Sequence, residues 1–352
     1  MSAKQPKKLL IFNILDILRK YTDENHRLSQ KEIEEILKKE YEMVVDRKSV
    51  KANLMDLIEF GYEIEYSESL RMIKNKTTGE MEESYILSDF YMARDITDSE
   101  LRLLIDGLLF STHLPYSQCK NLIGKLENLS NVYFRSRIKH IATMPEDKTN
   151  NQQLFFNIDI LDEAISHGKK VSFKYLEYDL DLKTVKKKQA DGKERLYVVS
   201  PYQMVAKEGK YYLICNYDKY DDVSNYRIDR ITDINILDET IKPFEKLEWS
   251  NGQKLNLATY MKEHVYMYSS GSSKVKLRIV NIMLSDIVDM FGKDIKVAKK
   301  EEGYVEVTVQ ATDQAIVQFA KNYAPDVIVL EPKRIREQVI EELMKGLKGY
   351  DC

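Results

Sequence analysis

The chain has 352 residues, of which 43% are hydrophobic and 32% charged, so it can bury packed cores and is not an intrinsically disordered chain. At roughly 150 residues per domain, this length predicts two or three domains. The 54 Lys and Arg residues nearly balance the 57 Asp and Glu residues, which gives a net charge of −3. Any contact with nucleic acid therefore requires a local basic patch rather than bulk positive charge.

The three cysteines, Cys119, Cys215 and Cys352, are far apart in the chain. This spacing predicts neither a disulfide framework nor a zinc site, and it indicates a reducing compartment. No run of the sequence reaches the roughly 18 apolar residues that a membrane-spanning helix needs. We therefore expect a cytoplasmic protein with no membrane partner.

The first 60 residues contain three amphipathic helix patterns. Apolar residues over 9–20 recur at helical spacing, and Ser29 followed by Glu32 predicts a capping box for a second helix. Asp46 is a candidate N-cap for a third helix, and Gly61 is expected to end that helix in a left-handed conformation.

Two short alternating stretches follow, at 62–66 and 84–88, and they predict the strands of a hairpin. Lys74 and Lys76 lie in the segment between them. Three helices followed by a hairpin is the pattern of a winged helix-turn-helix, which we assign to residues 1–92.

The third helix has the side chains that a DNA recognition helix uses. Arg and Lys suit guanine edges or phosphates, Asn suits adenine, and Ser suits either. We predict DNA-binding residues on this helix and at the hairpin tip: Arg47, Lys48, Ser49, Lys51, Asn53, Lys74 and Lys76. The alternative is an ordinary solvated helix face.

Residues 93–145 are expected to form a helical connector or dimerisation region, with a capping box at Thr97 and Glu100. A polar stretch with one proline, 144–153, predicts a linker. The apolar segment LRLLIDGLLF carries more hydrophobic residues than a simple tether requires.

The pattern changes after residue 154. A helix leads into β-rich runs that predict a small, strongly bent sheet or barrel of the Sm/SH3-like kind over 154–245. Residues 270–352 alternate as strand, helix, strand, strand, helix and strand, the βαββαβ order of a ferredoxin-like domain. The sequence thus predicts an α+β multidomain protein.

Enzymatic motifs are missing from the sequence, including the phosphate-binding glycine loops, the G-x-S-x-G nucleophile motif and the H-E-x-x-H zinc motif. The five histidines are isolated. We expect no enzymatic activity, no catalytic residues, no metal ion and no cofactor.

The chain resembles a known family of bacterial regulators. Its first 90 residues resemble the winged helix-turn-helix of DeoR/YafY-type regulators, with Arg47, Asp56-Leu57 and the terminal Gly61 in the recognition helix. Residues 154–240 resemble the WYL domain, whose Trp-Tyr-Leu triplet is here Tyr211-Tyr212-Leu213. Two further WYL motifs correspond to Ser200-Pro201-Tyr202 and to the run Tyr226-Arg227-Ile228-Asp229-Arg230-Ile231. Residues 274–350 resemble the WCX extension of such regulators.

The resemblance implies a sensor domain that binds a nucleotide or single-stranded nucleic acid. Arginine suits bidentate phosphate binding, and tyrosine rings can stack on bases. The candidate ligand-binding residues are Tyr175, Tyr202, Tyr226, Arg227 and Arg230. The alternative for each tyrosine is core packing, which we favour for Tyr212 and Leu213.

Two questions about this domain stay open at the level of sequence. Strand alternation places Arg227 and Arg230 on opposite sides unless a bend intervenes, so one of them can be a structural ion-pair partner. A basic run at 183–195 is either a solvated hairpin tip or a polyanion site.

The sequence therefore predicts a ligand-responsive bacterial transcriptional regulator that binds double-stranded operator DNA as a homodimer, because one recognition helix contacts few bases. The alternative is an accessory nucleic-acid-binding module that modulates an effector enzyme, with the N-terminal unit as a protein-contact surface.

Overall fold

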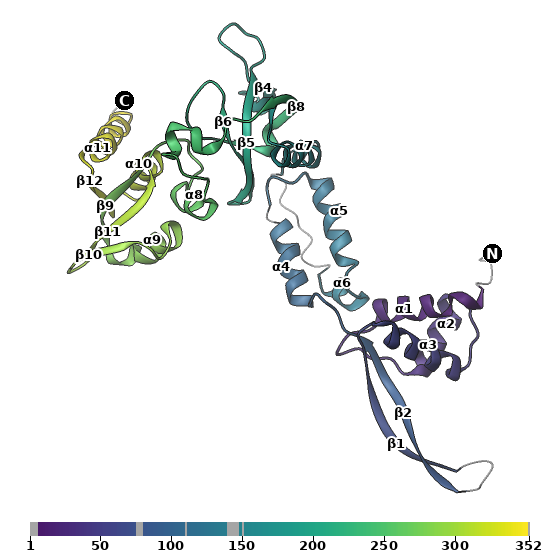
Figure 1. Ribbon diagram of the computed structural model, residues 1–352. Coiled ribbons are helices and arrows are strands. Elements are labelled where there is room, and N and C mark those ends of the chain that lie inside the picture. The colour runs from purple at the N-terminus through teal and green to yellow at the C-terminus, as the bar shows by residue number, and fades with distance from the viewer. Residues whose placement is uncertain (1–5, 75–79, 110, 139–147, 150, 351–352) are drawn as a thin grey trace. The chain divides into compact units, whose positions relative to one another are not determined.

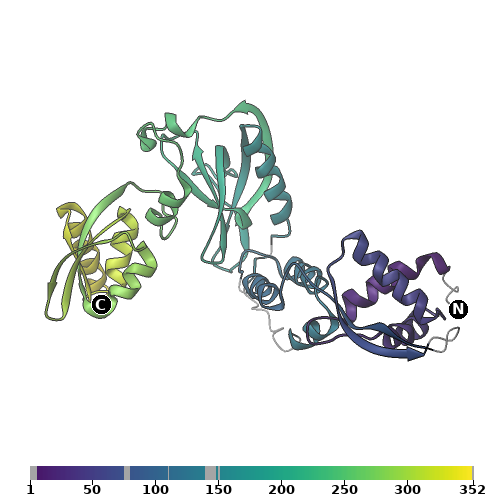
Figure 2. The ribbon, with the colours of Figure 1, turned by 60° about the horizontal axis from the view of Figure 1, so that its bottom comes forward.

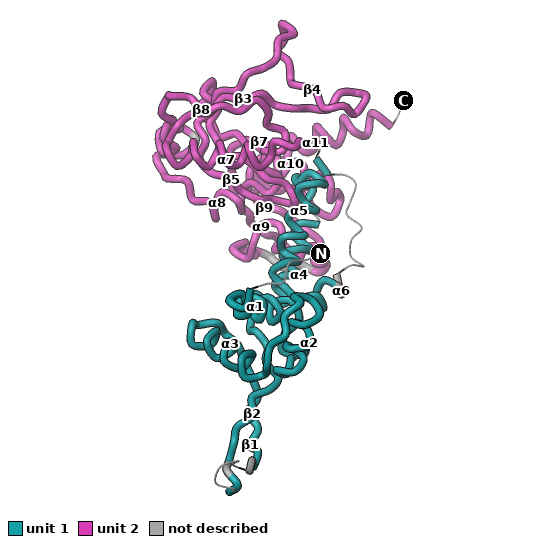
Figure 3. Tube along the Cα trace, turned by 90° about the vertical axis from the view of Figure 1, so that its right-hand side faces the viewer, with its two compact units in different colours: residues 1–150 teal, residues 151–352 magenta. Residues whose placement is uncertain are grey.

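The computed structural model describes residues 6–74, 80–109, 111–138, 148–149 and 151–350 (Figure 1). The chain divides into two compact units, Met1–Asn150 and Asn151–Cys352, which Figure 3 shows in different colours. Each unit combines helices with antiparallel strands, so the expected mixture of α and β structure in a multidomain chain is confirmed. Within the described part of the chain, no helix has the length and apolar content that a bilayer span requires.

The first unit begins with three helices: α1 (Leu10–Tyr21), α2 (Gln30–Glu40) and α3 (Arg47–Phe60). Their predicted ends are confirmed. Ser29 and Glu32 exchange side-chain and backbone hydrogen bonds in a complete capping box. The Asp46 carboxylate accepts a hydrogen bond from the Ser49 N–H at the start of α3, and Gly61, at φ 110°, ends that helix in the left-handed region.

The apolar faces of these helices meet in one core. Ile14 and Leu18 of α1, Ile33 of α2 and Leu54 of α3 are fully buried, and Phe90 from the following hairpin joins them. Burial of this core fixes which face of α3 points inward, and hence which residues of α3 reach solvent.

The hairpin is longer than its sequence pattern predicted. Strands β1 (Ile64–Lys74) and β2 (Met81–Met92) pair antiparallel along their whole length, whereas alternation indicated only 62–66 and 84–88. Ile64 and Leu87 are buried near the helices, but the ribbon continues beyond them (Figure 1). Cross-strand hydrogen bonds hold the outer part without a buried face, so hydrophobic alternation gives no sign of it.

Three further helices complete the first unit: α4 (Asp98–Leu109), α5 (Tyr116–Glu127) and α6 (Val132–Ile138). Thr97 and Glu100 form the predicted capping box at the start of α4. Leu101, Ile105 and Phe134 are buried together, which gives these helices a small core of their own.

The second unit opens with α7 (Leu154–Ser166), which packs against a strongly bent antiparallel sheet (Figure 2). The strands run in the order β4-β3-β5-β6-β7, and β8 pairs with the other edge of β3. Their bounds are β3 (Lys169–Tyr178), β4 (Thr184–Lys186), β5 (Leu196–Lys207), β6 (Lys210–Tyr217), β7 (Ser224–Arg227) and β8 (Ile231–Thr240). The Asn157 amide of α7 donates to the carbonyls of Ile228 and Ile231, which fixes the helix to the turn between β7 and β8.

A single 3-10 turn, η3 (Ile228–Arg230), separates β7 from β8. This is the bend that the sequence left open. The turn breaks the two-residue alternation of a strand. The spacing of Arg227 and Arg230 therefore does not decide which side of the sheet each side chain faces.

The chain then passes through short turns (η4, Phe244–Lys246; η5, Glu248–Ser250) and α8 (Leu257–Glu263) into a four-stranded antiparallel sheet. The elements occur in the expected order: β9 (Ser272–Val280), the turn η6 (Asn281–Met283), α9 (Leu284–Phe291), β10 (Lys296–Glu301), β11 (Tyr304–Thr312), α10 (Asp313–Asn322) and β12 (Val327–Glu331). The strand order is β10-β11-β9-β12, and the final helix is α11 (Lys333–Lys348).

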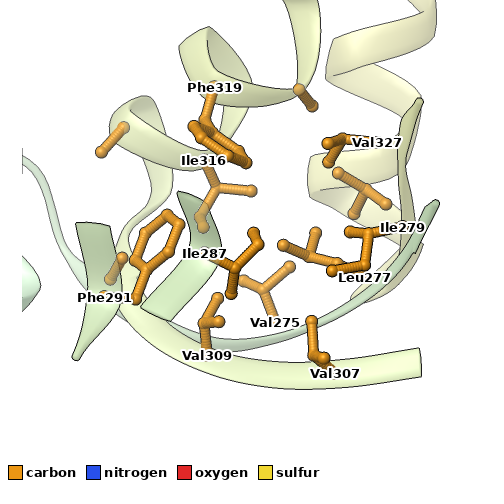
Figure 4. Packing of buried hydrophobic residues seen from close by; sticks show 14 of the residues in the cluster. Val275, Leu277, Ile279, Ile287, Phe291, Val307, Val309, Ile316, Phe319 and Val327 are labelled. Carbon is orange, nitrogen blue, oxygen red and sulfur yellow. The ribbon is translucent and has the colours of Figure 1, made fainter. Parts of the chain in front are cut away.

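The core of this last sheet lies under α9 and α10. Figure 4 shows Ile287 and Phe291 of α9 and Phe319 of α10 packed over Val275 and Val307 of the strands. This apolar core holds α9 and α10 on one face of the C-terminal sheet.

Candidate nucleic-acid interface

Helix α3 presents a basic outward face over its first turns. Arg47, Lys48 and Lys51 are exposed, while Val50 and Leu54 on the inward face are fully buried. The Arg47 side chain is 62% exposed, and its Nε lies 3.9 Å from the Glu34 carboxylate of α2. An exposed pair at this distance is weak, so the guanidinium can leave Glu34 for a phosphate or a base edge.

Two of the predicted contact residues on α3 are engaged within the helix. The Ser49 backbone and hydroxyl both donate to the Asp46 cap. The Asn53 amide donates to the Ser49 carbonyl at 2.8 Å. Both side chains are partly buried, so contact with a base requires Asn53 to release this bond.

The hairpin offers few positive charges along its strands. Acidic residues of β1 and β2 outnumber basic ones, as Glu65, Glu68, Glu82, Glu83 and Asp89 against Arg71 and Lys74. Lys74 ends β1 opposite Met81, although its side chain and the whole of Lys76 lie outside the described residues. Among the described side chains of this hairpin, Arg71 is therefore the exposed cation that a phosphate contact could use.

In the second unit, a cluster of aromatic rings lies on one face of the bent sheet. We call it the ring cluster: Phe173, Tyr175, Tyr197, Tyr217 and Tyr226. Tyr226 packs edge-on against Tyr175, Tyr197 and Phe173, with ring centroids 5.3, 5.3 and 5.4 Å apart. Burial raises the pKa of Tyr175 to about 12. The sequence-predicted Tyr175 and Tyr226 therefore belong chiefly to a packed aromatic layer.

Two arginines of this domain lie against tyrosine rings. The Arg195 guanidinium lies 4.8 Å from the Tyr197 ring centroid and 5.6 Å from that of Tyr217. Its hydrogen bond to Tyr217 raises the pKa of Arg195. Arg230 lies 5.6 Å from the ring of Tyr178, which is 56% exposed. Each pair combines a cationic donor with a tyrosine ring, the combination that single-stranded nucleic acid binds.

Arg227 has a different environment from Arg230. Its Nη2 and Nε donate to the two carboxylate oxygens of Asp229 at 2.7 and 3.1 Å, and the Asp229 side chain is 2% exposed. Burial is the largest single effect and lowers the pKa of Arg227, but the hydrogen bond to Asp229 and the charge of that carboxylate, with smaller effects of Tyr175 and Tyr212, together raise it. The Arg227 N–H also donates to the Tyr175 hydroxyl. These bonds make Arg227 the ion-pair partner that the sequence considered for one of the two arginines.

Tyr202 is placed away from the other candidate ligand residues. Its hydroxyl donates to the Lys242 carbonyl at 2.8 Å, and its ring packs edge-on against Phe244 at 5.3 Å. Tyr212 packs against the same group of buried residues, which includes Phe244, and Leu213 is fully buried. The expectation of core packing for Tyr212 and Leu213 is confirmed.

The basic run at 183–195 is largely neutralised. Lys186 shares Glu194 and Asp233 with Lys174 in a four-residue network. Lys187 lies 3.8 Å from Glu177. The structure therefore favours the solvated hairpin over a polyanion site for Lys186 and Lys187. Arg195 differs from these lysines, because its guanidinium lies against the Tyr197 ring.

Arg195, Tyr197 and Tyr217 were not among the predicted ligand residues. Arg195 and Tyr197 are two positions apart at the start of β5, so strand alternation already placed them on one face. The sequence does not show which strands pair. The pairing of β3 with β5 and of β5 with β6 brings Tyr175 and Tyr217 onto that face.

Other binding features are separate from the ring cluster. A polar cavity of about 560 Å³ is lined by Asn251, Gln253, Asn256 and Gln310 among others, and none of the candidate ligand residues lines it. Among the described residues, no group of three or more His, Cys, Asp and Glu side chains could hold a metal ion.

Residues 157–236 match the family model of the WYL domain. The chain contains a WYL domain. The match includes the ring cluster, Arg195, Arg227 and Arg230. No curated protein matches the chain.

Two solved structures are similar at low levels. Proteasome accessory factor B/C (PafBC) of Arthrobacter aurescens has a TM-score of 0.28 and 14% identity, over 99% of this chain and 50% of that chain. A CRISPR Cas-related protein has a TM-score of 0.35 and 14% identity, over 100% of this chain and 88% of that chain. The chain thus spans about half the length of PafBC.

Proposed function

We propose that this protein is a cytoplasmic transcriptional regulator that binds operator DNA as a homodimer and senses a nucleotide or single-stranded nucleic acid. In this proposal, α1 to α3 and the β1–β2 hairpin are a winged helix-turn-helix with α3 as recognition helix. The C-terminal sheet, with its β10-β11-β9-β12 order, is a ferredoxin-like WCX domain.

The observation that carries the proposal is the joint presence of a WYL domain and of α3 with its exposed basic face. Arg47, Lys48 and Lys51 lie on the first turns, where recognition helices contact base edges and phosphates. Their outward direction follows from the burial of Val50 and Leu54.

The DNA-binding proposal is tested by selecting bound sequences from a random duplex library and measuring affinity for the selected site against scrambled competitor. Arg47→Ala and Asn53→Ala are expected to lose discrimination, since a good bidentate base contact contributes about 1–3 kcal/mol. Lys48→Ala and Lys51→Ala are expected to weaken all sequences alike and to reduce the salt slope by roughly 0.9 per lost phosphate contact.

Lys293→Ala is the matched control, because Lys293 is an exposed lysine of the second unit. It removes the same charge and leaves α3 intact. Selection that yields no preferred sequence, or four α3 variants that bind like the control, would overturn the proposed role of α3.

We further propose that the ligand binds at the two arginine–tyrosine pairs of this domain. Arg195 and Arg230 contact phosphate, and the exposed faces of Tyr178 and Tyr217 stack on bases. Arg227 holds Asp229 in the η3 turn, which also carries Arg230, rather than contacting the ligand.

Fluorescence anisotropy with a labelled single-stranded oligonucleotide tests this site. Arg195→Ala and Arg230→Ala are expected to weaken binding at least tenfold without changing the melting temperature. Arg278→Ala is a matched control, because Arg278 lies 5.5 Å from the Tyr304 ring and forms an equivalent pair on the C-terminal sheet. Equal losses in all three variants would indicate a nonspecific charge effect and contradict the assignment.

One observation favours the accessory-module alternative. The hairpin exposes Leu70, Met72, Met81 and Tyr85, each at least 49% exposed, on strands that are mainly acidic. An apolar, acidic ribbon suits a protein partner better than DNA. Loss of an effector's binding after Leu70→Ser and Tyr85→Ser, in a protein whose wild type selects no preferred DNA sequence, would favour this alternative.

A further inference from the structure

Helix α11 exposes an apolar stripe that its own domain does not cover. Ile335 and Val339 are buried in the C-terminal core, at 0% and 7% exposure. On another side of the same helix, the stripe consists of Ile340, Leu343, Met344 and Leu347, which are 47%, 41%, 61% and 66% exposed. We call these four residues the α11 stripe.

The spacing of the α11 stripe is the spacing of a helix-packing seam. Positions i, i+3, i+4 and i+7 lie on one side of a helix over two turns. At 3.6 residues per turn, the centre of this side lies about 110° around the axis from Ile335 and Val339. The helix therefore has two apolar sides: one packs on α10 and β12, and the other lies about 110° around the axis and is exposed.

Single exposed apolar residues are common on protein surfaces, but four in one stripe are typical of a contact surface. The stripe occupies the C-terminal half of α11, whereas the buried residues lie toward its N-terminal half. A partner can thus lie along the stripe without displacing the core contacts.

The charges beside the stripe indicate what the partner is. Glu341 and Lys345 lie together on the flank that faces away from the core, with Nζ and Oε1 2.6 Å apart and both side chains more than 60% exposed. Glu337 and Lys348 lie on the same flank. Along this flank the two acids precede the two bases, so the flank is complementary to itself when one copy is reversed.

A reversed second copy also aligns the apolar residues. About a two-fold axis through the middle of the stripe, Ile340 of one helix faces Leu347 of the other, and Leu343 faces Met344. The same axis keeps the outer flanks on one side, so that Glu341 of each copy faces Lys345 of the other. In a parallel pair, the outer flank of one helix would instead face the side of the other that carries Val339 and packs on its own sheet.

We propose that the α11 stripe is a self-association surface, on which α11 helices of two copies of this chain pack antiparallel. The proposal deepens the proposed function, since it rests on the homodimer expected there, and it assigns that dimer to the C-terminal domain. Self-association is measurable without DNA, so the two proposals fail independently.

Sedimentation equilibrium of the full chain at micromolar concentration tests the surface. Wild type is expected to be a dimer, and Met344→Glu and Leu347→Glu are expected to raise the dimer dissociation constant at least tenfold. Ile282→Glu is the control, because Ile282 is 84% exposed in η6 and outside the stripe. Circular dichroism should be unchanged in all three variants, since none of these side chains is in the core. The melting temperature of the two stripe variants should lose the dependence on protein concentration that dimerisation gives to wild type.

Charge reversal tests the antiparallel arrangement. Glu341→Lys and Lys345→Glu are each expected to weaken the dimer, and the double variant to restore it. In a Cys352→Ser background, Met344→Cys is expected to form a disulfide with its own copy near the two-fold axis. Ile340→Cys is expected to form one only when mixed with Leu347→Cys.

Several results would overturn the inference. Wild type that is monomeric at 100 μM, or stripe variants that remain dimers, would exclude this surface. Self-crosslinking of Ile340→Cys without Leu347→Cys would exclude the antiparallel arrangement. Sequence-specific DNA binding by monomeric stripe variants would leave α3 as the proposed recognition helix. A wild type that dimerises through α11 but binds no specific DNA would contradict the proposed function and leave the α11 proposal standing.

Discussion

Arg227 forms an ion pair with the buried carboxylate of Asp229. Substitution of Arg227 therefore tests the stability of the domain rather than ligand binding. Arg227→Ala leaves the Asp229 charge buried without its partner, which is expected to destabilise the second unit by about 3 kcal/mol. Urea denaturation of Arg227→Ala and Arg230→Ala separates the roles, because Arg230→Ala should retain wild-type stability. Adding Asp229→Asn to Arg227→Ala should recover part of the loss. A stable Arg227→Ala variant that no longer binds the oligonucleotide would show that Arg227 contacts the ligand.

His264 predicts a pH dependence of stability. It is 1% exposed and stacks on Tyr260 with ring centroids 3.7 Å apart, and burial lowers the pKa of His264 to about 4. Between about pH 6.5 and 4 the unfolded chain binds a proton that the folded chain does not, so stability falls as the pH falls through this window. The full effect is about 3 kcal/mol at about 1.4 kcal/mol per pKa unit.

Melting temperatures from pH 7 to 4.5 measure this effect. His264→Phe keeps an aromatic ring against Tyr260 and cannot titrate, so its melting temperature should fall less steeply than that of wild type. His167→Gln removes an exposed histidine and serves as control. If the melting temperatures of all three proteins fell equally with pH, His264 would bind its proton as readily in the folded chain as in the unfolded chain.

At the scale of an element, Lys148 stabilises the end of α4. Its ammonium group is buried and donates to the carbonyls of Leu109 and Ser111 at 3.1 and 2.7 Å, close to the negative end of the helix dipole. Lys148→Met is expected to cost about 1.5–3 kcal/mol, the range for hydrogen bonds to charged groups. Lys120→Met, which removes an exposed lysine of α5, is the control, and chemical denaturation is the measurement. Equal stability of the two variants would contradict a capping role.

Elements whose signals are local were predictable from sequence. The caps at Ser29, Asp46 and Thr97 and the stop at Gly61 depend on residues a few positions apart, and each is present in the structure. Lys148 lies in the segment that composition assigned to a linker. Its role depends on carbonyls about 40 residues earlier, which no local pattern includes.

The candidate site was predictable in part for the same reason. Arg230 and the rings of Tyr175 and Tyr226 were found from a strand-like run, and the structure brings them to one region of the sheet. Tyr202 was included because it belongs to the Ser200-Pro201-Tyr202 motif and a tyrosine ring can stack on a base, but its ring packs with Phe244 in a separate hydrophobic cluster. Arg195 was missed because its partners Tyr197 and Tyr217 meet only when β5 pairs with β6.

At the scale of the whole molecule, the proposed DNA-binding and ligand-binding residues belong to different compact units. Each unit has hydrophobic clusters built from its own residues alone. The boundary between them is sharp, because Lys148 is bonded within the first unit and Asn151 donates to the Asp229 and Ile231 carbonyls of the second. A ligand at the ring cluster can change DNA affinity only if it binds two arrangements of the full chain with different affinities.

We therefore expect the two units to retain their binding separately and to lose the coupling. A fragment of residues 151–352 should unfold cooperatively, bind the oligonucleotide like the full chain and self-associate through α11. A fragment of residues 1–150 should prefer the selected DNA site with lower affinity, since the paired half-site contacts are lost, and should not respond to the oligonucleotide. The measurement is DNA affinity of the full chain and of the fragment, each with and without oligonucleotide. A first-unit fragment that responds to the oligonucleotide like the full chain would place the sensor in the first unit and contradict its assignment to the WYL domain.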